Sequence, residues 1–177
     1  LNVRIDYWSL NDGYHTETSK STGVQTRDDH YSDRSDWEPS FSVATAHQLA
    51  DSLRLNLGSG YTFRLPTINE LYRPYRVGGD ITEANTDLDP ERFFNLEAGL
   101  TWQAHERLSL RTGVFQYWID DAIANVRTTA PAGVFVPLGG SYNQRQNVDS
   151  ATVFGWETRL EYAATDTLTF ALNYLYT

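Results

Sequence analysis

The stretch FRLPTINELYRPYRVGGDITEANTDLDPERFFNLE, residues 63–97, decides the fold, because it joins two segments that both alternate in polarity. In the segment before it, Leu53, Leu55 and Leu57 share one face, while Arg54 and Asn56 share the other. The segment after it, residues 92–104, alternates in the same way. A period of two is the pattern of a half-buried β-strand. A connection of this length inside a compact domain usually has a function or lacks order, so we expect one of the two for residues 65–91.

The same alternation recurs along the whole chain, and helical periodicity is nowhere persuasive. One face of each segment is apolar, and the other is hydrated or carries paired charges. The pattern predicts seven strands, at roughly residues 1–10, 37–49, 53–64, 92–104, 108–126, 147–164 and 167–177.

Short and long connections alternate strictly between these strands. Tight turns are expected around Asp51, His105–Glu106 and Thr165–Asp166, whereas long loops rich in Gly, Pro, Asp, Asn and Ser cover about 11–36, 65–91 and 127–146. All long loops would therefore leave the sheet at one end and all short turns at the other. This is the layout of an outer-membrane barrel, with short periplasmic turns and long extracellular loops.

Composition narrows the class of protein. No run approaches the 18 or so apolar residues that a membrane helix needs, but a membrane-spanning strand needs only about 9–11. The 11 Tyr, 8 Phe and 5 Trp gather at strand ends, where interfacial girdles of a barrel would lie. A net charge of −9 argues against nucleic acid as a partner, and the absence of cysteine excludes disulfides.

A soluble antiparallel sheet with one face on a core would produce the same alternation. An all-β carbohydrate-recognition module therefore stays open as an alternative, and an autotransporter or porin-like barrel is a third. Against the soluble alternative, the sequence offers no helix or second core-forming element that could cover the apolar face.

Four stretches carry a resemblance to a known family: FRLPTINELY (63–72), ANTDLDPERFFNLEAGL (84–100), WIDDAIANV (118–126) and QNVDSATVFGWETRLEY (146–162). In this order they resemble the β-barrel of a TonB-dependent outer-membrane receptor. The match covers about residues 53–177. Its motif residues are Arg64, Pro66, Thr67, Glu70, Leu71, Tyr72, Asn85, Leu88, Pro90, Glu91, Glu97, Gly99, Asn147, Val148, Gly155 and Glu157.

The resemblance implies an all-β fold, an antiparallel up-and-down transmembrane segment of about seven strands from a barrel of about 22 strands. Residues 1–177 would belong to this single barrel domain, without the N-terminal plug and the closing C-terminal strand. The implied function is TonB-coupled uptake of a scarce nutrient, foremost a ferric siderophore, across the bacterial outer membrane. The implied partners are that cargo, the protein's own plug, the TonB complex and outer-membrane lipid.

The residues nominate no active site and no cofactor. His15, His30, His47 and His105 are scattered, with no metal-ligand spacing, so we expect neither an enzyme nor a metal site. Calcium at Asp28, Asp29 and Asp33 is conceivable, but the spacing is not that of an EF-hand. A solvated loop is the favoured interpretation of 11–36.

Ligand binding is predicted in two loops. Tyr72, Arg73, Tyr75 and Arg76 alternate rings and cations that could hold an anionic aromatic ligand, and Phe135, Tyr142 and Arg145 lie in the only long loop with net positive charge. A structural alternative is favoured for the first group. In it, Tyr72 and Pro66 pack the loop and its arginines pair with Glu70, Asp80 or Glu83.

Overall fold

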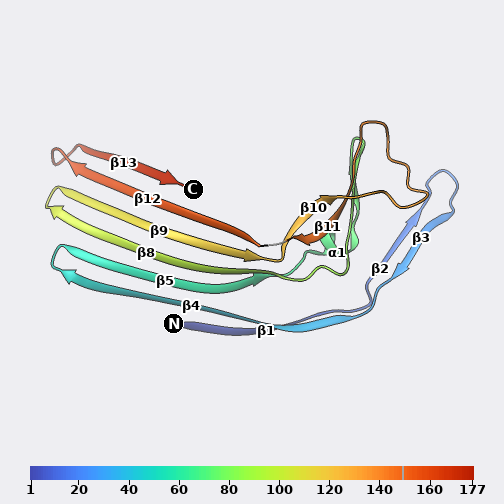
Figure 1. Ribbon diagram of the computed structural model, residues 1–177, viewed down its shortest axis with the longest axis horizontal. Helices are drawn as coiled ribbons and strands as arrows, with labels where there is room; N and C mark the ends of the chain where they lie inside the picture. The colour runs from blue at the N-terminus through green and yellow to red at the C-terminus, as the bar shows by residue number, and fades with distance from the viewer. Residues whose placement is uncertain (149) are drawn as a thin grey trace.

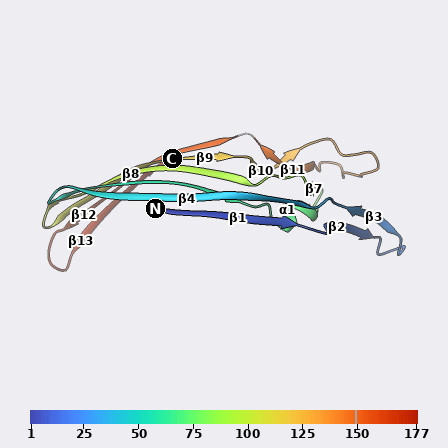
Figure 2. The same ribbon diagram turned by 90° about the horizontal axis from the view of Figure 1, so that it is seen from below.

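The computed structural model describes residues 1–148 and 150–177, and its main feature is one seven-stranded antiparallel sheet (Figure 1). The strands are β1 (Asn2–Leu10), β4 (Arg34–Ala50), β5 (Leu53–Arg64), β8 (Glu91–His105), β9 (Leu108–Asp120), β12 (Ala151–Ala163) and β13 (Thr169–Tyr176). Each pairs with the next along the chain. The predicted up-and-down order is confirmed. Seen from below, the sheet is a thin, curved layer (Figure 2).

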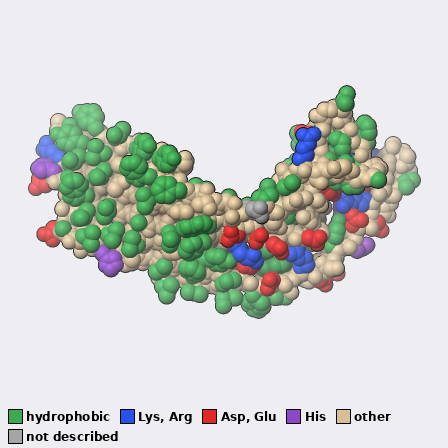
Figure 3. Space-filling view, in the orientation of Figure 1, with side chains coloured by type: hydrophobic (Ala, Val, Ile, Leu, Met, Phe, Trp, Pro, Cys, Tyr) green, Lys and Arg blue, Asp and Glu red, His purple; other side chains and the backbone are tan. Residues whose placement is uncertain are grey.

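The register places apolar and polar side chains in separate rows. Leu57 lies opposite Ala98, which lies opposite Val114. Apolar side chains cover the visible face of the sheet in Figure 3. No second layer packs on this face in the described part of the chain. The buried hydrophobic residues all lie in the loop region instead: Leu71, Ile81, Leu88 and Tyr142.

The long loops carry secondary structure of their own. The first contains a hairpin of β2 (Tyr14–Thr18) and β3 (Gln25–His30). The other two form a four-stranded sheet, in which β6 (Tyr75–Val77) pairs with β7 (Asp80–Glu83), β7 pairs in parallel with β11 (Tyr142–Val148), and β11 pairs with β10 (Ala122–Arg127). Residues 11–36 therefore contain an ordered hairpin, and most of its strand residues are exposed to solvent, as the favoured interpretation of this loop expected.

Two predicted strands are also corrected at their ends. The segment 108–126 is not one strand, because Asp121 adopts a left-handed backbone with φ of 57° that redirects the chain from β9 into β10. Aspartate is one of the few residues that tolerate this conformation. The segment 147–164 starts as a main-sheet strand only at Ala151, since Asn147 and Val148 end β11. Asp149 lies outside the described residues.

A one-turn helix, α1 (Ile68–Tyr72), follows β5 and is not predicted by the sequence pattern. The Thr67 hydroxyl accepts a hydrogen bond from the Glu70 N–H at 3.3 Å, and the Glu70 carboxylate accepts one from the Thr67 N–H at 2.7 Å. This reciprocal capping box stabilises the first turn, while Leu71 is buried beneath it. A single turn is too short to produce a periodic signal in sequence.

No helix among the described residues is long and apolar enough to cross a membrane.

Candidate functional site

The base of the loop region is held by a cluster of ion pairs at the end of the main sheet. Arg64, the last residue of β5, donates from Nη1 to the Glu70 carboxylate at 2.9 Å and from Nε to Glu91, the first residue of β8. The other oxygen of Glu91 accepts the backbone N–H of Ile123 in β10 at 2.6 Å. One guanidinium and one buried carboxylate therefore fix where the loop 65–90 leaves and re-enters the sheet.

This cluster predicts a loss of loop order in acid. Burial alone raises the pKa of Glu70, but the hydrogen bonds from Arg64 and Thr67 outweigh it, so the pKa lies below its ordinary value of 4.5. A carboxylate with a lowered folded-state pKa contributes stability above its unfolded pKa, and that stability is lost as pH falls through the folded pKa. The protection of residues 65–90 against amide hydrogen exchange, taken relative to the intrinsic exchange rate at each pH, should therefore decrease as pH falls below about 4.5.

The variant Glu70→Gln provides the comparison for that experiment. It should exchange faster at neutral pH and show a weaker acid dependence, because its side chain cannot titrate. An identical acid response in Glu70→Gln and in the unaltered protein would assign the effect to other carboxylates.

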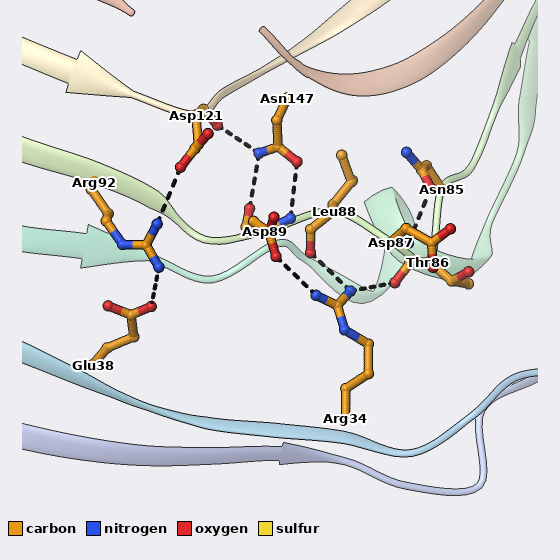
Figure 4. A network of polar contacts seen from close by, with 10 residues as sticks. All are labelled: Arg34, Glu38, Asn85, Thr86, Asp87, Leu88, Asp89, Arg92, Asp121 and Asn147. Carbon is orange, nitrogen blue, oxygen red and sulfur yellow. Dashed lines mark hydrogen bonds and ion pairs between the residues drawn. The ribbon is translucent and has the colours of Figure 1, made fainter. Parts of the chain in front are cut away.

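A second group of contacts joins the loops through Asn147 (Figure 4). Its Nδ2 donates to the backbone oxygens of Asp89 at 3.0 Å and Asp121 at 2.7 Å, and its Oδ1 accepts the Asp89 N–H at 2.9 Å. One amide thus satisfies backbone groups of two segments, the one that precedes β8 and the one that joins β9 to β10. The motif residue Asn147 therefore holds the start of β10 beside the segment that precedes β8.

Two arginines bridge a gap between β4 and the rest of the wall (Figure 4). The register of β4 with β5 ends at Phe41 and Tyr61. Beyond that point, Arg34 of β4 donates to the backbone oxygens of residues 86 and 88 and pairs with the carboxylate of residue 89 at 3.1 Å. Arg92 of β8 pairs with Glu38 at 2.7 Å and Asp121 at 3.1 Å. These long side chains replace the missing strand pairing.

A cavity of about 940 Å³ lies between the β2–β3 hairpin and the other two long loops. Four of the seven predicted ligand-binding residues line it: Tyr75, Arg76, Phe135 and Tyr142. Phe135 is 78% exposed, whereas Tyr142 is buried. This cavity is the candidate ligand-binding site.

The other three predicted residues do not line the cavity. Tyr72 packs its ring against Tyr31, with 5.4 Å between the centroids. The Arg145 guanidinium lies 5.3 Å from the centre of the Tyr75 ring and donates to a backbone oxygen of α1. Arg73 follows α1 as its C-terminal cap.

The structural alternative for the arginines is wrong in its choice of partners. Glu70 pairs with Arg64, and Glu83 pairs with Arg27 at 2.7 Å. Asp80 accepts hydrogen bonds from the N–H and the hydroxyl of Ser141, both at 2.8 Å. The three carboxylates proposed for Arg73 and Arg76 therefore have other partners, although Tyr72 does pack the loop as expected.

Sequence reasoning missed the charged group around Arg27. Arg27 donates from Nε to Asp29 and from Nη1 to Glu83, and the Tyr31 hydroxyl donates to Asp29 at 3.3 Å. The hydrogen bond from Arg27 lowers the pKa of Asp29. Burial raises the pKa of the Tyr142 phenol, and the charge of Glu83 raises it further. Arg27 and Glu83 are 56 residues apart, so no local pattern could indicate their pairing.

The acidic residues considered for calcium are used separately. Asp29 is paired with Arg27, and Asp33 accepts the backbone N–H of Asp12 at 3.0 Å. Within residues 1–148 and 150–177, no group of three or more His, Cys, Asp or Glu side chains is arranged to hold a metal ion.

Comparison with known proteins identifies the family. The family model described as "TonB dependent receptor-like, beta-barrel" matches residues 1–177. The vitamin B12 transporter BtuB of Photobacterium profundum is 27% identical over 162 residues, which are 90% of this chain and 22% of the relative. The chain thus spans about a fifth of the length of that curated relative.

Solved structures show the same fold. The copper transporter OprC superposes with a TM-score of 0.72 and 26% identity, over 98% of this chain and 26% of that protein. The siderophore receptor PirA from Pseudomonas aeruginosa superposes with a TM-score of 0.68 and 18% identity, over 81% of this chain and 29% of that protein. The match of the family model over the whole chain, together with the shared sheet, shows that this chain belongs to the TonB-dependent receptor β-barrel family.

Proposed function

We propose that the complete protein imports a scarce nutrient in a TonB-coupled manner, and that its cargo is a ferric siderophore. The observation that carries this proposal is the cavity of about 940 Å³ at the end of the sheet from which the long loops emerge. Its volume lies in the range of known small-molecule sites, and its wall combines aromatic rings with a few charged groups. Such a wall suits a bulky chelate with flat ligand groups.

Cobalamin is the second candidate cargo. It is favoured by the 27% identity to a protein named as a vitamin B12 transporter. Cobalamin is also a bulky metal complex with flat surfaces, so the same cavity would accommodate it by the same contacts. The two cargoes differ in charge and in donor groups, which makes them separable by experiment.

The polar face of the sheet supports the proposed plug as a partner. Arg54, Glu97, Arg111, Glu157 and Arg159 line a hollow of about 1080 Å³ on this face. A face with both signs of charge suits a polar protein surface better than lipid, since charged side chains at the lipid-facing midplane of a barrel cost about 2–4 kcal/mol each. The apolar face would contact outer-membrane lipid.

Uptake measurements test the proposal. A strain that lacks the complete gene should lose accumulation of iron-labelled siderophore, and a plasmid copy should restore it only when TonB is present. Cobalt-labelled cobalamin in the same strains decides between the two cargoes. Accumulation of neither compound, or accumulation that does not need TonB, would contradict the proposed function.

A further inference from the structure

The charged residues that line the loop cavity are predominantly acidic. Four carboxylates line it, from Glu17, Asp29, Glu83 and Asp87, against two guanidiniums, from Arg27 and Arg76. A cleft lined with an excess of one sign concentrates ligands of the opposite sign and disfavours ligands of the same sign. The balance of charge in this wall therefore bears on the cargo it can accept.

The Arg27 charge is not available to an anionic ligand. Its guanidinium already pairs with Asp29 and with Glu83, so the three groups together carry a net negative charge. Arg145, one of the predicted ligand-binding residues, lies over the Tyr75 ring and donates to a backbone oxygen outside the cavity lining. The cations of the loops are thus largely occupied by the protein itself.

The groups left free in the cavity are two acids and one base. Asp87 makes no side-chain hydrogen bond or ion pair within the described residues, and Glu17 has only the His15 ring at 3.4 Å. Arg76 likewise has no carboxylate partner in the described part of the chain. Asp87 and Arg76 are therefore the two residues whose replacement changes the cavity charge without breaking an ion pair.

Exposed aromatic rings at the same cavity indicate independently that it accepts a ligand. Phe135 is 78% exposed and lines the same cavity as the carboxylates, so it presents bare ring surface, whereas one face of Tyr75, which is 39% exposed, already carries the Arg145 guanidinium. Aromatic faces beside negative charges are the surroundings that favour organic cations, because a ring face and a carboxylate both attract positive charge.

We propose that this cavity selects a cationic metal chelate over an anionic one. The inference rests on the proposed function and specifies the charge class of its cargo. A chelate with a free ammonium group would place it against the Asp87 and Glu17 carboxylates and its flat face against Phe135. A highly anionic chelate would meet an excess of like charge and only Arg76 as a free cation.

Two ferric complexes of opposite charge test the proposal on the complete protein in detergent. One is the complex of a linear trihydroxamate with a free amine, a monocation, and the other is a tris-catecholate complex, a trianion. Titration calorimetry should show that the monocation binds at least about tenfold tighter. The difference should shrink as salt is raised, because ions screen charges at the surface.

Variants of the two free groups supply the residue-level test. Asp87→Asn should weaken binding of the monocation about threefold, and Arg76→Gln should strengthen it by a similar factor, as expected for partly exposed charges. Asp51→Asn, in a short turn at the far end of the sheet, is the matched control and should change neither complex.

The outcomes separate this inference from the function on which it rests. Equal affinity for both complexes, or tighter binding of the trianion that is lost in Arg76→Gln, would overturn the inference while leaving a chelate receptor in place. Failure of the protein to bind either ferric complex or cobalamin would instead overturn the proposed function.

Discussion

Replacing Arg92 by alanine is expected to lower the free energy of unfolding by about 3 kcal/mol, because it leaves a buried carboxylate without its partner. Glu38 is only 3% exposed, and its carboxylate accepts a hydrogen bond from Arg92 at 2.7 Å. Arg92 is itself partly exposed, which places the expected loss at the lower end of the range for broken buried pairs. Denaturant unfolding of the complete protein in detergent, followed by tryptophan fluorescence, measures the change.

A double replacement provides the control. Arg92→Leu combined with Glu38→Leu removes both charges, so it should recover most of the loss, since a buried ion pair can often be exchanged for apolar side chains at little cost. The free energy of unfolding of Glu38→Gln should lie between that of Arg92→Ala and that of the double variant. If the double variant were as unstable as Arg92→Ala, the loss would come from packing of the arginine stem and not from the unpaired carboxylate.

Replacing Glu91 by alanine should loosen the loop region and cost about 2–3 kcal/mol, because two donors lose their acceptor. These donors are the Arg64 guanidinium and the backbone N–H of Ile123. Hydrogen exchange should accelerate in residues 65–90 and at the start of β10, while the main sheet keeps its protection. The cavity depends on these loops, so ligand affinity should fall as well.

Glu91→Gln separates the two contributions. Glutamine can still accept the Ile123 N–H, but it removes the charge that faces Arg64, so its effect should be intermediate. Glu106→Ala, in the exposed turn between β8 and β9, is the matched control at the opposite end of β8 and should have no effect on the loops. Uniform acceleration over the whole sheet in Glu91→Ala would mean that the cluster stabilises the barrel wall and not the loops.

Family membership decides between the three classes of protein that composition and alternation left open: a TonB-dependent receptor barrel, a soluble carbohydrate-recognition module, and an autotransporter or porin-like barrel. Members of this family are bacterial outer-membrane proteins, and the relatives are transporters and receptors, not enzymes. The predictions of the family, of its outer-membrane location and of a non-enzymatic class are therefore confirmed, and the soluble carbohydrate-binding module is no longer tenable. The four stretches 63–72, 84–100, 118–126 and 146–162, in that order, carried the resemblance to this family.

The main sheet could be predicted because its signal is local. Side chains of a strand alternate between two faces, so the polarity pattern of residues 53–64 alone shows which side chains share a face. The short turn at Asp51 makes β4 and β5 neighbours in the sheet. The same holds for β8 with β9 and for β12 with β13. The sequence pattern by itself therefore determined these three pairs of neighbouring strands, the two faces and the end from which the loops emerge, while the order across the long loops followed from the resemblance to the family.

Only the tertiary structure decided how the loops are arranged. The contacts that shape the cavity and its base join residues far apart, such as Arg27 with Glu83, 56 positions away, and Asn147 with Asp89, 58 positions away. Loops have no repeating pattern that would reveal such partners, and a carboxylate is attracted to whichever cation the fold brings near it. For that reason the sequence identified Tyr75, Arg76, Phe135 and Tyr142 as candidates. The acidic character of the cavity follows only from the tertiary structure, which places the β2–β3 hairpin, with Glu17 and Asp29, along one side of it.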